Sequence, residues 1–192
     1  SIDGAPLASV LSTLQGDTFV LPPALLATLH GKPLADGTHT VRLTAADEFG
    51  NRSAVRSLSF VLDTTAPEAP STPVLVSPTG LGNLTNVTTP SVRVTAVAAT
   101  TVRLYLNGNF VKQAFNYTGE VVFPIGPLAD GVQHITADAV DAAGNTSLRS
   151  TVLDVTIDTR TPATTTLELD PASDTLPLAD GHTTFEQVSL TG

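Results

Sequence analysis

A seven-residue phrase occurs twice in this chain, as DEFGNRS at residues 47–53 and as DAAGNTS at residues 141–147. Around it, LADGTHTVRLTAADEFGNRS at 34–53 aligns without a gap on LADGVQHITADAVDAAGNTS at 128–147. Both copies continue to an Asp-Thr-x-x-Pro signature, DTTAP at 63–67 and DTRTP at 158–162. Self-similarity at a spacing of 94 residues predicts an array of similar modules.

Proline-rich segments follow both signatures, and a new apolar run begins after each one. We therefore place module ends at residues 67 and 162. This division predicts a partial module at 1–67 that lacks its opening strands, a complete module at 68–162, and the opening strands of a third module at 163–192. The first copy carries about ten extra residues near 23–32, and their Ala and Leu content indicates a short helix.

Apolar and polar residues alternate through 102–106 and 135–139, which is typical of strands with one wet face. Between two apolar runs, Asn107-Gly108 predicts a two-residue hairpin. About seven short strands per module, separated by turn residues, indicate an all-β fold of tandem immunoglobulin-like antiparallel β-sandwich modules. We expect Phe110, Phe115 and Phe123 to lie in the core.

The repeated phrase is interpreted as the turn between the last two strands of each module. Asp47 or Asp141 ends the penultimate strand, and the glycine of the phrase supplies a left-handed residue. The asparagine that follows, Asn51 or Asn145, is expected to bond its own backbone. Closing a turn accounts for the phrase without any chemistry.

Composition excludes several classes of partner. The formal net charge is -9 and the chain has only two lysines, which argues against nucleic acid and anionic membranes. No apolar stretch is long enough for a membrane span, so no membrane insertion is expected. Without cysteine there is no disulfide framework and no thiolate metal site.

Catalytic patterns are missing from the sequence. It contains no nucleophile elbow, no zinc-protease pair of histidines, no phosphate-binding loop and no dinucleotide fingerprint. We expect the four histidines, His30, His39, His134 and His182, to be surface or strand-edge residues. Asp138 is expected on a solvated strand face. The prediction is that the chain is not an enzyme.

The combination of LADG, DAAGN and DTRTP resembles the bacterial Ig-like tandem repeats of giant surface adhesins and biofilm-associated proteins. The resemblance implies a stalk that projects an adhesive end, an extracellular or bacterial cell-surface location, and neighbouring modules of the same chain as partners. In such adhesins calcium binds near the joints between modules. Two alternatives stay open: a ligand-binding module for carbohydrate or protein, and a spacer in a secreted enzyme. Against the carbohydrate alternative, the chain has no Trp and only two Tyr.

Calcium is the one cofactor that the sequence suggests, because it prefers carboxylate, amide and carbonyl oxygens on loops. At the second joint the candidate ligands come from the module end, the neighbouring turn and the next module. They are Asp141, Asn145, Asp158, Asp170 and Asp174. At the first joint a weaker set consists of Asp47, Asn51 and Asp63. We expect the second set to converge at one pole and to bind better, although Asp residues also commonly cap turns.

Self-association is a further expectation. Residues 163–192 of one copy have the strands that 1–67 of another copy lacks, so copies are able to join head to tail by exchanging strands. Unpaired strand edges favour such pairing.

Overall fold

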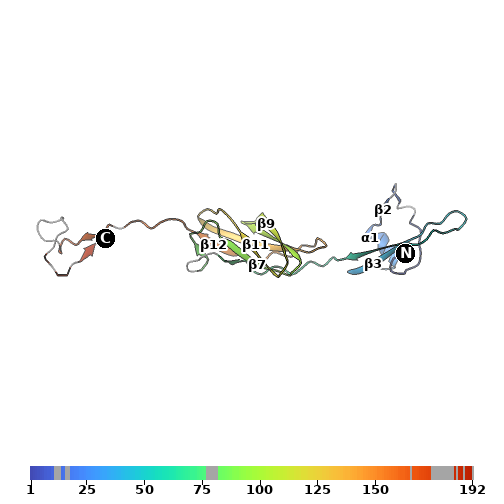
Figure 1. Cartoon of the computed structure of the whole chain (residues 1–192), viewed down its shortest axis with the longest axis horizontal. Coiled ribbons are helices and arrows are strands. Elements are labelled where there is room, and N and C mark those ends of the chain that lie inside the picture. Colours follow the sequence, from blue (N-terminus) through green and yellow to red (C-terminus); the bar gives the residue numbers. More distant parts are fainter. Residues whose placement is uncertain are drawn as a thin grey trace. The chain divides into compact units, whose positions relative to one another are not determined.

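The computed structural model describes residues 1–10, 14–15, 18–76, 82–164, 166–173, 184, 186–187 and 189–191. The chain separates into two compact units, Ser1–Asp158 and Thr159–Gly192. Strands make up nearly all the regular structure of the described residues (Figure 1). None of the helices found there is long and apolar enough to cross a membrane.

The middle module is built from two sheets (Figure 1). One sheet has the order β10-β7-β5, with bounds Glu120–Pro124, Ser91–Thr95 and Val74–Leu75. The other has the order β6-β12-β11-β8-β9, with bounds Leu84–Thr85, Leu153–Ile157, Gly131–Val140, Thr100–Leu106 and Asn109–Asn116. Every neighbouring pair is antiparallel except β12 and β6. The predicted all-β class with antiparallel β-sandwich modules is confirmed for this part of the chain.

The core of this module lies between the inner faces of its two sheets. Val102 and Leu104 of β8 and Ile135 and Ala137 of β11 are fully buried, as their alternation predicts. Val92 of β7 belongs to the same cluster from the opposite sheet. Burial of these side chains is the main favourable term for such a fold, at about 1.5 to 3 kcal/mol for each large one.

The three phenylalanines of the module differ in burial. Phe123 on β10 is 1% exposed, as expected of a core residue. Phe110 and Phe115 are 55% and 47% exposed, so the prediction that they lie in the core is wrong. Both are on β9, the edge strand of its sheet, whose pairing with β8 shifts register at Leu104/Tyr105. A periodic apolar pattern does not reveal that a strand is an edge.

The hairpin between β8 and β9 forms at Asn107-Gly108, as predicted. The two residues have φ angles of 50° and 83°, and the strands pair up to Leu106↔Asn109. Positive φ at both central positions defines the type I′ turn that matches the twist of the flanking strands. Asparagine and glycine tolerate it best.

The part of the chain before residue 63 contains β1 (Leu14–Gln15), β2 (Thr18–Phe19), α1 (Pro23–His30), β3 (Gly37–Leu43) and β4 (Arg56–Leu62). The predicted helix is confirmed as α1, which begins with proline and ends at Gly31, a left-handed residue with φ of 90°. Glycine suits this position because it has no Cβ to clash. The ribbon β3-β4 pairs from Gly37↔Leu62 to Leu43↔Arg56.

In the last unit, β13 (Glu168–Leu169) pairs antiparallel with β14 (Leu190–Thr191). The unit begins at Thr159, close to the predicted start of the third module at 163. The three predicted modules, and the boundary at residue 67 in particular, stay predictions.

Candidate functional site

The turn of the second repeat is closed by Asp141. Its Oδ1 accepts backbone N–H groups from Ala143 at 2.9 Å, Gly144 at 2.8 Å and Asn145 at 2.9 Å. Its Oδ2 accepts the side-chain amide of Asn145 at 3.0 Å. These bonds, the one from the Asn145 amide first, hold the pKa of Asp141 below its usual value, because each stabilises the carboxylate.

Asp47 closes the first copy of the turn in the same way. It accepts the backbone and side-chain N–H groups of Asn51, both at 2.8 Å, and the N–H of Phe49 at 3.0 Å. The pKa of Asp47 is lowered, chiefly by the Asn51 side chain. Each asparagine therefore donates to the aspartate of its own phrase, where we expected a bond to its own backbone. The glycines take the expected left-handed conformation, with φ of 88° at Gly50 and 97° at Gly144.

The two ends of β11 hold different members of the predicted calcium set. At one end Gly131 pairs with Ile157, which directly precedes Asp158. At the other end Val140 pairs with Thr146 inside the turn. Ten residues of strand separate the ends, or roughly 30 Å. Asp141 and Asn145 thus lie far from Asp158, so the expectation that this set meets at one pole is wrong.

The first predicted set is divided in the same manner. Asp47 and Asn51 follow the end of β3 at which Leu43 pairs with Arg56, whereas Asp63 follows Leu62 at the other end of the ribbon. Calcium binding at either joint stays a prediction. Within the described ranges, no three His, Asp or Glu side chains form a group that fits a metal ion.

One contact joins the two predicted sets. The side-chain amide of Asn145, besides its bond to Asp141, donates to the backbone carbonyl of Asp63 at 3.0 Å. The carboxylate of Asp63 accepts the N–H of Thr65 at 3.1 Å. The turn of the second repeat is therefore bonded to the segment that leaves β4.

The remaining members of the second set are on either side of residue 159. The N–H of Asp158 donates to the carbonyl of Thr85 at 3.0 Å, which fixes the end of β12. Asp170 caps a turn by accepting the N–H of Ala172 at 2.7 Å. Asp174 lies outside the described residues, as does His182.

A structural role for Asp36 was missed by the sequence reasoning. Its carboxylate accepts the N–H and hydroxyl of Thr64 at 2.9 and 2.8 Å and the hydroxyl of Thr65 at 2.6 Å. These bonds, that of Thr65 first, lower the pKa of Asp36. The repeat itself contains the signal, since Asp-Gly and Asp-Thr recur together in both copies.

Asp138 is buried, not solvated as predicted. It accepts two bonds from Arg103, at 2.6 and 3.0 Å, and one from the Tyr105 hydroxyl at 2.9 Å. The guanidinium of Arg149 lies 3.5 Å from the centre of the Tyr105 ring. Asp138 raises the pKa of Arg103, and burial, followed by the bond to Asp138, raises that of Tyr105. A carboxylate that accepts three hydrogen bonds in this way links two strands of the sheet face.

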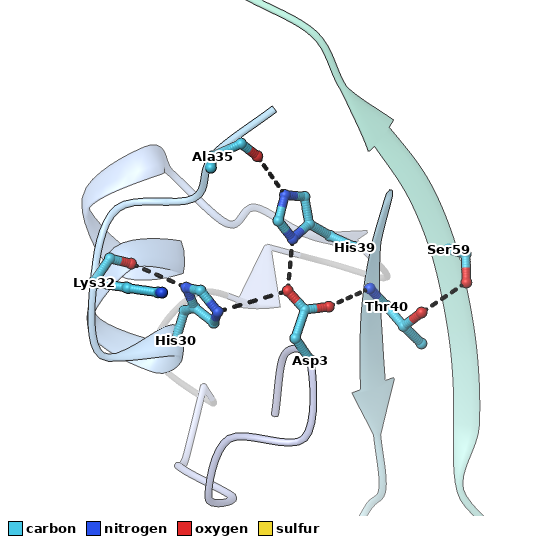
Figure 2. Close-up of polar contacts among 7 residues, drawn as sticks. All are labelled: Asp3, His30, Lys32, Ala35, His39, Thr40 and Ser59. Atoms are coloured by element: carbon cyan, nitrogen blue, oxygen red, sulfur yellow. Dashed lines mark hydrogen bonds and ion pairs between the residues drawn. The ribbon is translucent and has the colours of Figure 1, made fainter. Parts of the chain in front are cut away.

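His39 and Asp3 form a second polar centre (Figure 2). His39 was predicted to be a surface or strand-edge residue. It is on β3, a strand of the two-stranded sheet β3-β4, and its side chain is buried rather than at the surface. Its Nδ1 lies 2.6 Å from Asp3 Oδ2 and its Nε2 lies 2.7 Å from the carbonyl of Ala35. No nucleophile faces the imidazole in the contacts that the structure gives it.

Residues 77–159 match the family model of the bacterial Ig-like domain, which covers the middle module. This segment is a bacterial Ig-like domain. The matched residues contain the turn at 141–147 and every strand of the two sheets except β5. A search of curated proteins finds no match for the chain.

Among solved structures, the chain is similar to the BSP domain of a biofilm-associated protein, at 18% identity and a TM-score of 0.36, over 68% of this chain and 21% of that one. It is also similar to the spore cortex lytic enzyme SleM of Clostridium perfringens, at 16% identity and a TM-score of 0.33, over 47% and 28%. The fibronectin(III)-like modules of Clostridium thermocellum CbhA match at 14% identity and 0.41, over 70% of each chain. The chain spans less than a third of the length of the first two structures. At these identities and TM-scores the likeness supports no inference about the function of the chain.

Proposed function

We propose that this chain is a stalk segment of a bacterial cell-surface or secreted adhesin, in which tandem Ig-like modules hold an adhesive end away from the cell. The observation that supports it is the bond from Asn145 to the carbonyl of Asp63. It uses a residue of the repeated phrase to secure the segment between two repeats. A stalk needs such joints, whereas a catalyst needs convergent reactive groups.

Further contacts restrain the same segment. The hydroxyls of Thr72 and Thr151 are hydrogen-bonded, and the N–H of Ser71 donates to the carbonyl of Thr95 at 2.9 Å. Residues 63–73 include three prolines, and each proline fixes φ and so reduces the number of conformations that the segment can adopt. Bonds at both ends and prolines between them favour a stiff connection over a flexible linker.

The proposal includes a place and partners. The location is the bacterial surface or the extracellular medium, and the partners are the neighbouring modules of the same protein. Head-to-tail association of copies by strand exchange belongs to the proposal as its untested part. In this role the segment is not an enzyme, and the paired state of Asp138 supports that assignment.

A distance measurement between repeats tests the joint. The chain has no cysteine, so spin labels attach only at introduced sites, and exposed Ser57 and Gln113 suit substitution by cysteine. Double electron–electron resonance should give a narrow distribution of distances between the two spin labels, and this distribution should broaden in Asn145→Ala. The matched variant Asn51→Ala loses the equivalent bond to Asp47 and should leave the distribution narrow. Equal widths in the parent and Asn145→Ala would refute a secured joint.

We also propose that calcium binds at the second joint, but with fewer of the predicted ligands than the sequence suggested. Since Asp141 and Asn145 lie at the other end of β11, Asp158 is the one predicted ligand of this module that remains near that joint. Millimolar calcium should raise the melting temperature of the full chain, and Asp158→Ala should abolish the rise while Asp141→Ala retains it. A melting temperature that calcium leaves unchanged would exclude binding at this joint.

A second candidate function is ligand binding at β9. Phe115 and Tyr117 are exposed neighbours with ring centres 4.7 Å apart, and exposed aromatic rings are a common sugar or peptide contact. Titration with oligosaccharides should quench tyrosine fluorescence in the parent and not in Tyr117→Ala. If neither protein responds, the stalk role stands alone.

A further inference from the structure

Three ionisable side chains from separate segments meet beside β3 (Figure 2). Asp3 comes from the first residues of the chain, His30 ends α1, and His39 is on β3. Asp3 Oδ2 lies 2.6 Å from Nδ1 of His39 and 3.7 Å from Nε2 of His30. All three side chains are at most a quarter exposed.

The partners of His39 define its protonation state. Nδ1 faces a carboxylate oxygen of Asp3 and Nε2 faces the carbonyl oxygen of Ala35 at 2.7 Å. A carbonyl oxygen has no hydrogen to give, and the other Asp3 oxygen already accepts the N–H of Thr40 at 2.8 Å. Both ring nitrogens must therefore donate, which requires the imidazolium form. The bond to Asp3, ahead of the bond to Ala35, raises the pKa of His39.

A metal ion does not fit between these groups. Two ligands of a tetrahedral zinc ion, each about 2.0 to 2.2 Å from the metal, lie about 3.3 Å apart, well beyond the 2.6 Å between Asp3 and His39. The described residues contain no group of three side chains that suits a metal. A hydrogen bond between an imidazolium and a carboxylate accounts for the short contact.

The cluster holds the first residues of the chain on the edge of β3. Asp3 donates its N–H to the carbonyl of Thr40 at 3.0 Å, and Arg42 donates its N–H to the carbonyl of Ser1 at 2.9 Å. Ile2, between them, is 1% exposed. Asp3 and Gly4 both have positive φ, 49° and 80°, and the turn they form is closed by the N–H of Ala5, which donates to the carbonyl of Ile2 at 2.9 Å.

We propose that Asp3 and His39 form a proton-gated clasp that holds residues 1–5 against β3 and opens when His39 loses its proton. A neutral imidazole has one N–H for two acceptors, so one oxygen must then face a ring lone pair. Loss of the charge also removes the ion pair that anchors Asp3.

The groups around His39 come from every element packed on it. From the first segment comes Asp3, and from the end of α1 comes His30, whose ring lies edge-on with its centre 6.2 Å away. The loop after α1 contributes the carbonyl of Ala35, while the carbonyl of Lys32 accepts from Nδ1 of His30 at 3.2 Å. From β4, the Phe60 ring lies 5.6 Å away and carries no charge. Asp3 is thus the one anion in direct contact with His39 among these neighbours.

The sign of the pH dependence follows from linkage. The pKa of His39 is raised on folding, so its contribution is complete below the unfolded value of about 6.5 and is lost as pH rises through the folded value. The pKa of Asp3 is lowered, chiefly by His39, so its contribution is lost as pH falls below about 3.8. The clasp is therefore closed from about pH 3.8 up to the pKa of His39 in the folded chain. Opening of the clasp releases one proton, from His39. The ratio of closed to open clasp therefore falls by at most about tenfold per pH unit above 6.5, and it levels off above the folded pKa of His39.

The test begins with the unmodified chain. Ring ¹⁵N shifts of His39 at pH 6 should show both nitrogens protonated, and this measurement needs no variant. Amide exchange of Thr40 and Arg42, expressed as protection factors, should weaken between pH 6.5 and the titration midpoint of His39. Asp3→Asn should show low protection at every pH, and His134→Gln, which removes an exposed imidazole beside Asp154, should behave as the parent.

Three outcomes would overturn the proposal. A neutral His39 ring at pH 6 would contradict the imidazolium. Protection of Thr40 and Arg42 that stays constant while His39 titrates would mean that the proton does not gate the segment. Stoichiometric shifts of the His30 and His39 rings on adding zinc would show that the cluster is a metal site.

Discussion

Asn116 joins the end of β9 to the loop between β7 and β8 by hydrogen bonds, and replacing it by aspartate should strongly destabilise the middle module. The side chain is fully buried. Its amide donates to the carbonyls of Ala96 and Val97, both at 3.1 Å, and its Oδ1 accepts the N–H of Gly119 at 2.8 Å. Asn116→Asp keeps the shape but turns a double donor into a second acceptor. A buried, ionised aspartate then has an oxygen facing two carbonyl oxygens.

The cost is the sum of two effects. Each carbonyl that loses its donor costs about 0.5 to 1.5 kcal/mol, and Val97 loses less because the Thr100 hydroxyl also donates to it at 2.7 Å. An unpaired buried charge brings the total to about 3 to 5 kcal/mol, a large part of the 5 to 15 kcal/mol that a typical domain has. For a module of this size the melting temperature should fall by at least about 12 °C.

Calorimetry of the full chain at pH 7 measures the loss, with Asn109→Asp as the control. Asn109 begins the same strand and is exposed, so its substitution should cost little. The loss in Asn116→Asp should shrink as pH falls, because the buried carboxyl gains a proton and recovers one donor. A loss below about 1 kcal/mol, or an equal loss in Asn109→Asp, would refute the reasoning, since either outcome means that the side chain is not a buried donor.

Two other substitutions in this module have matched controls. Gly126→Ala would place a Cβ 2.4 Å from the carbonyl oxygen of Thr88, so it should lower the free energy of unfolding by about 1 to 3 kcal/mol more than Gly131→Ala, which has a similar φ and no neighbour within 4 Å. If urea titrations give equal losses of unfolding free energy for the two variants, the backbone around Gly126 moves aside at no cost and the prediction is wrong. Arg103→Met should cost about 3 kcal/mol because it removes the cation from the buried carboxylate of Asp138 and leaves it only the hydrogen bond from the Tyr105 hydroxyl. The control Arg93→Met breaks an exposed pair with Glu120 at 4.0 Å and should cost less than about 1 kcal/mol.

The architecture of the repeat was predictable because local signals coincide with the fold. Period-two alternation identified the buried faces of β8 and β11, and Asn107-Gly108 located a hairpin, since both depend on backbone geometry within a few residues. Burial that depends on distant segments was not predictable in the same way. Asp138 alternates as an outward residue, yet Arg103 and Tyr105 cover it from the next strand. The position of β9 at a sheet edge likewise appears only once the strand order is known.

The candidate calcium ligands show where one-dimensional spacing misleads. Asp141 and Asp158 are 17 positions apart in the sequence and flank the same pair of strands, which suggested one site. An antiparallel hairpin, however, places its turn at one end and its two free ends at the other. With ten residues in β11, the turn is carried to the end of the module at which the chain enters, where Asn145 bonds the carbonyl of Asp63. In the second copy of the phrase, Asn145 therefore has two structural contacts: it donates to Asp141 within its own turn and to the carbonyl of Asp63 in the segment that leaves β4.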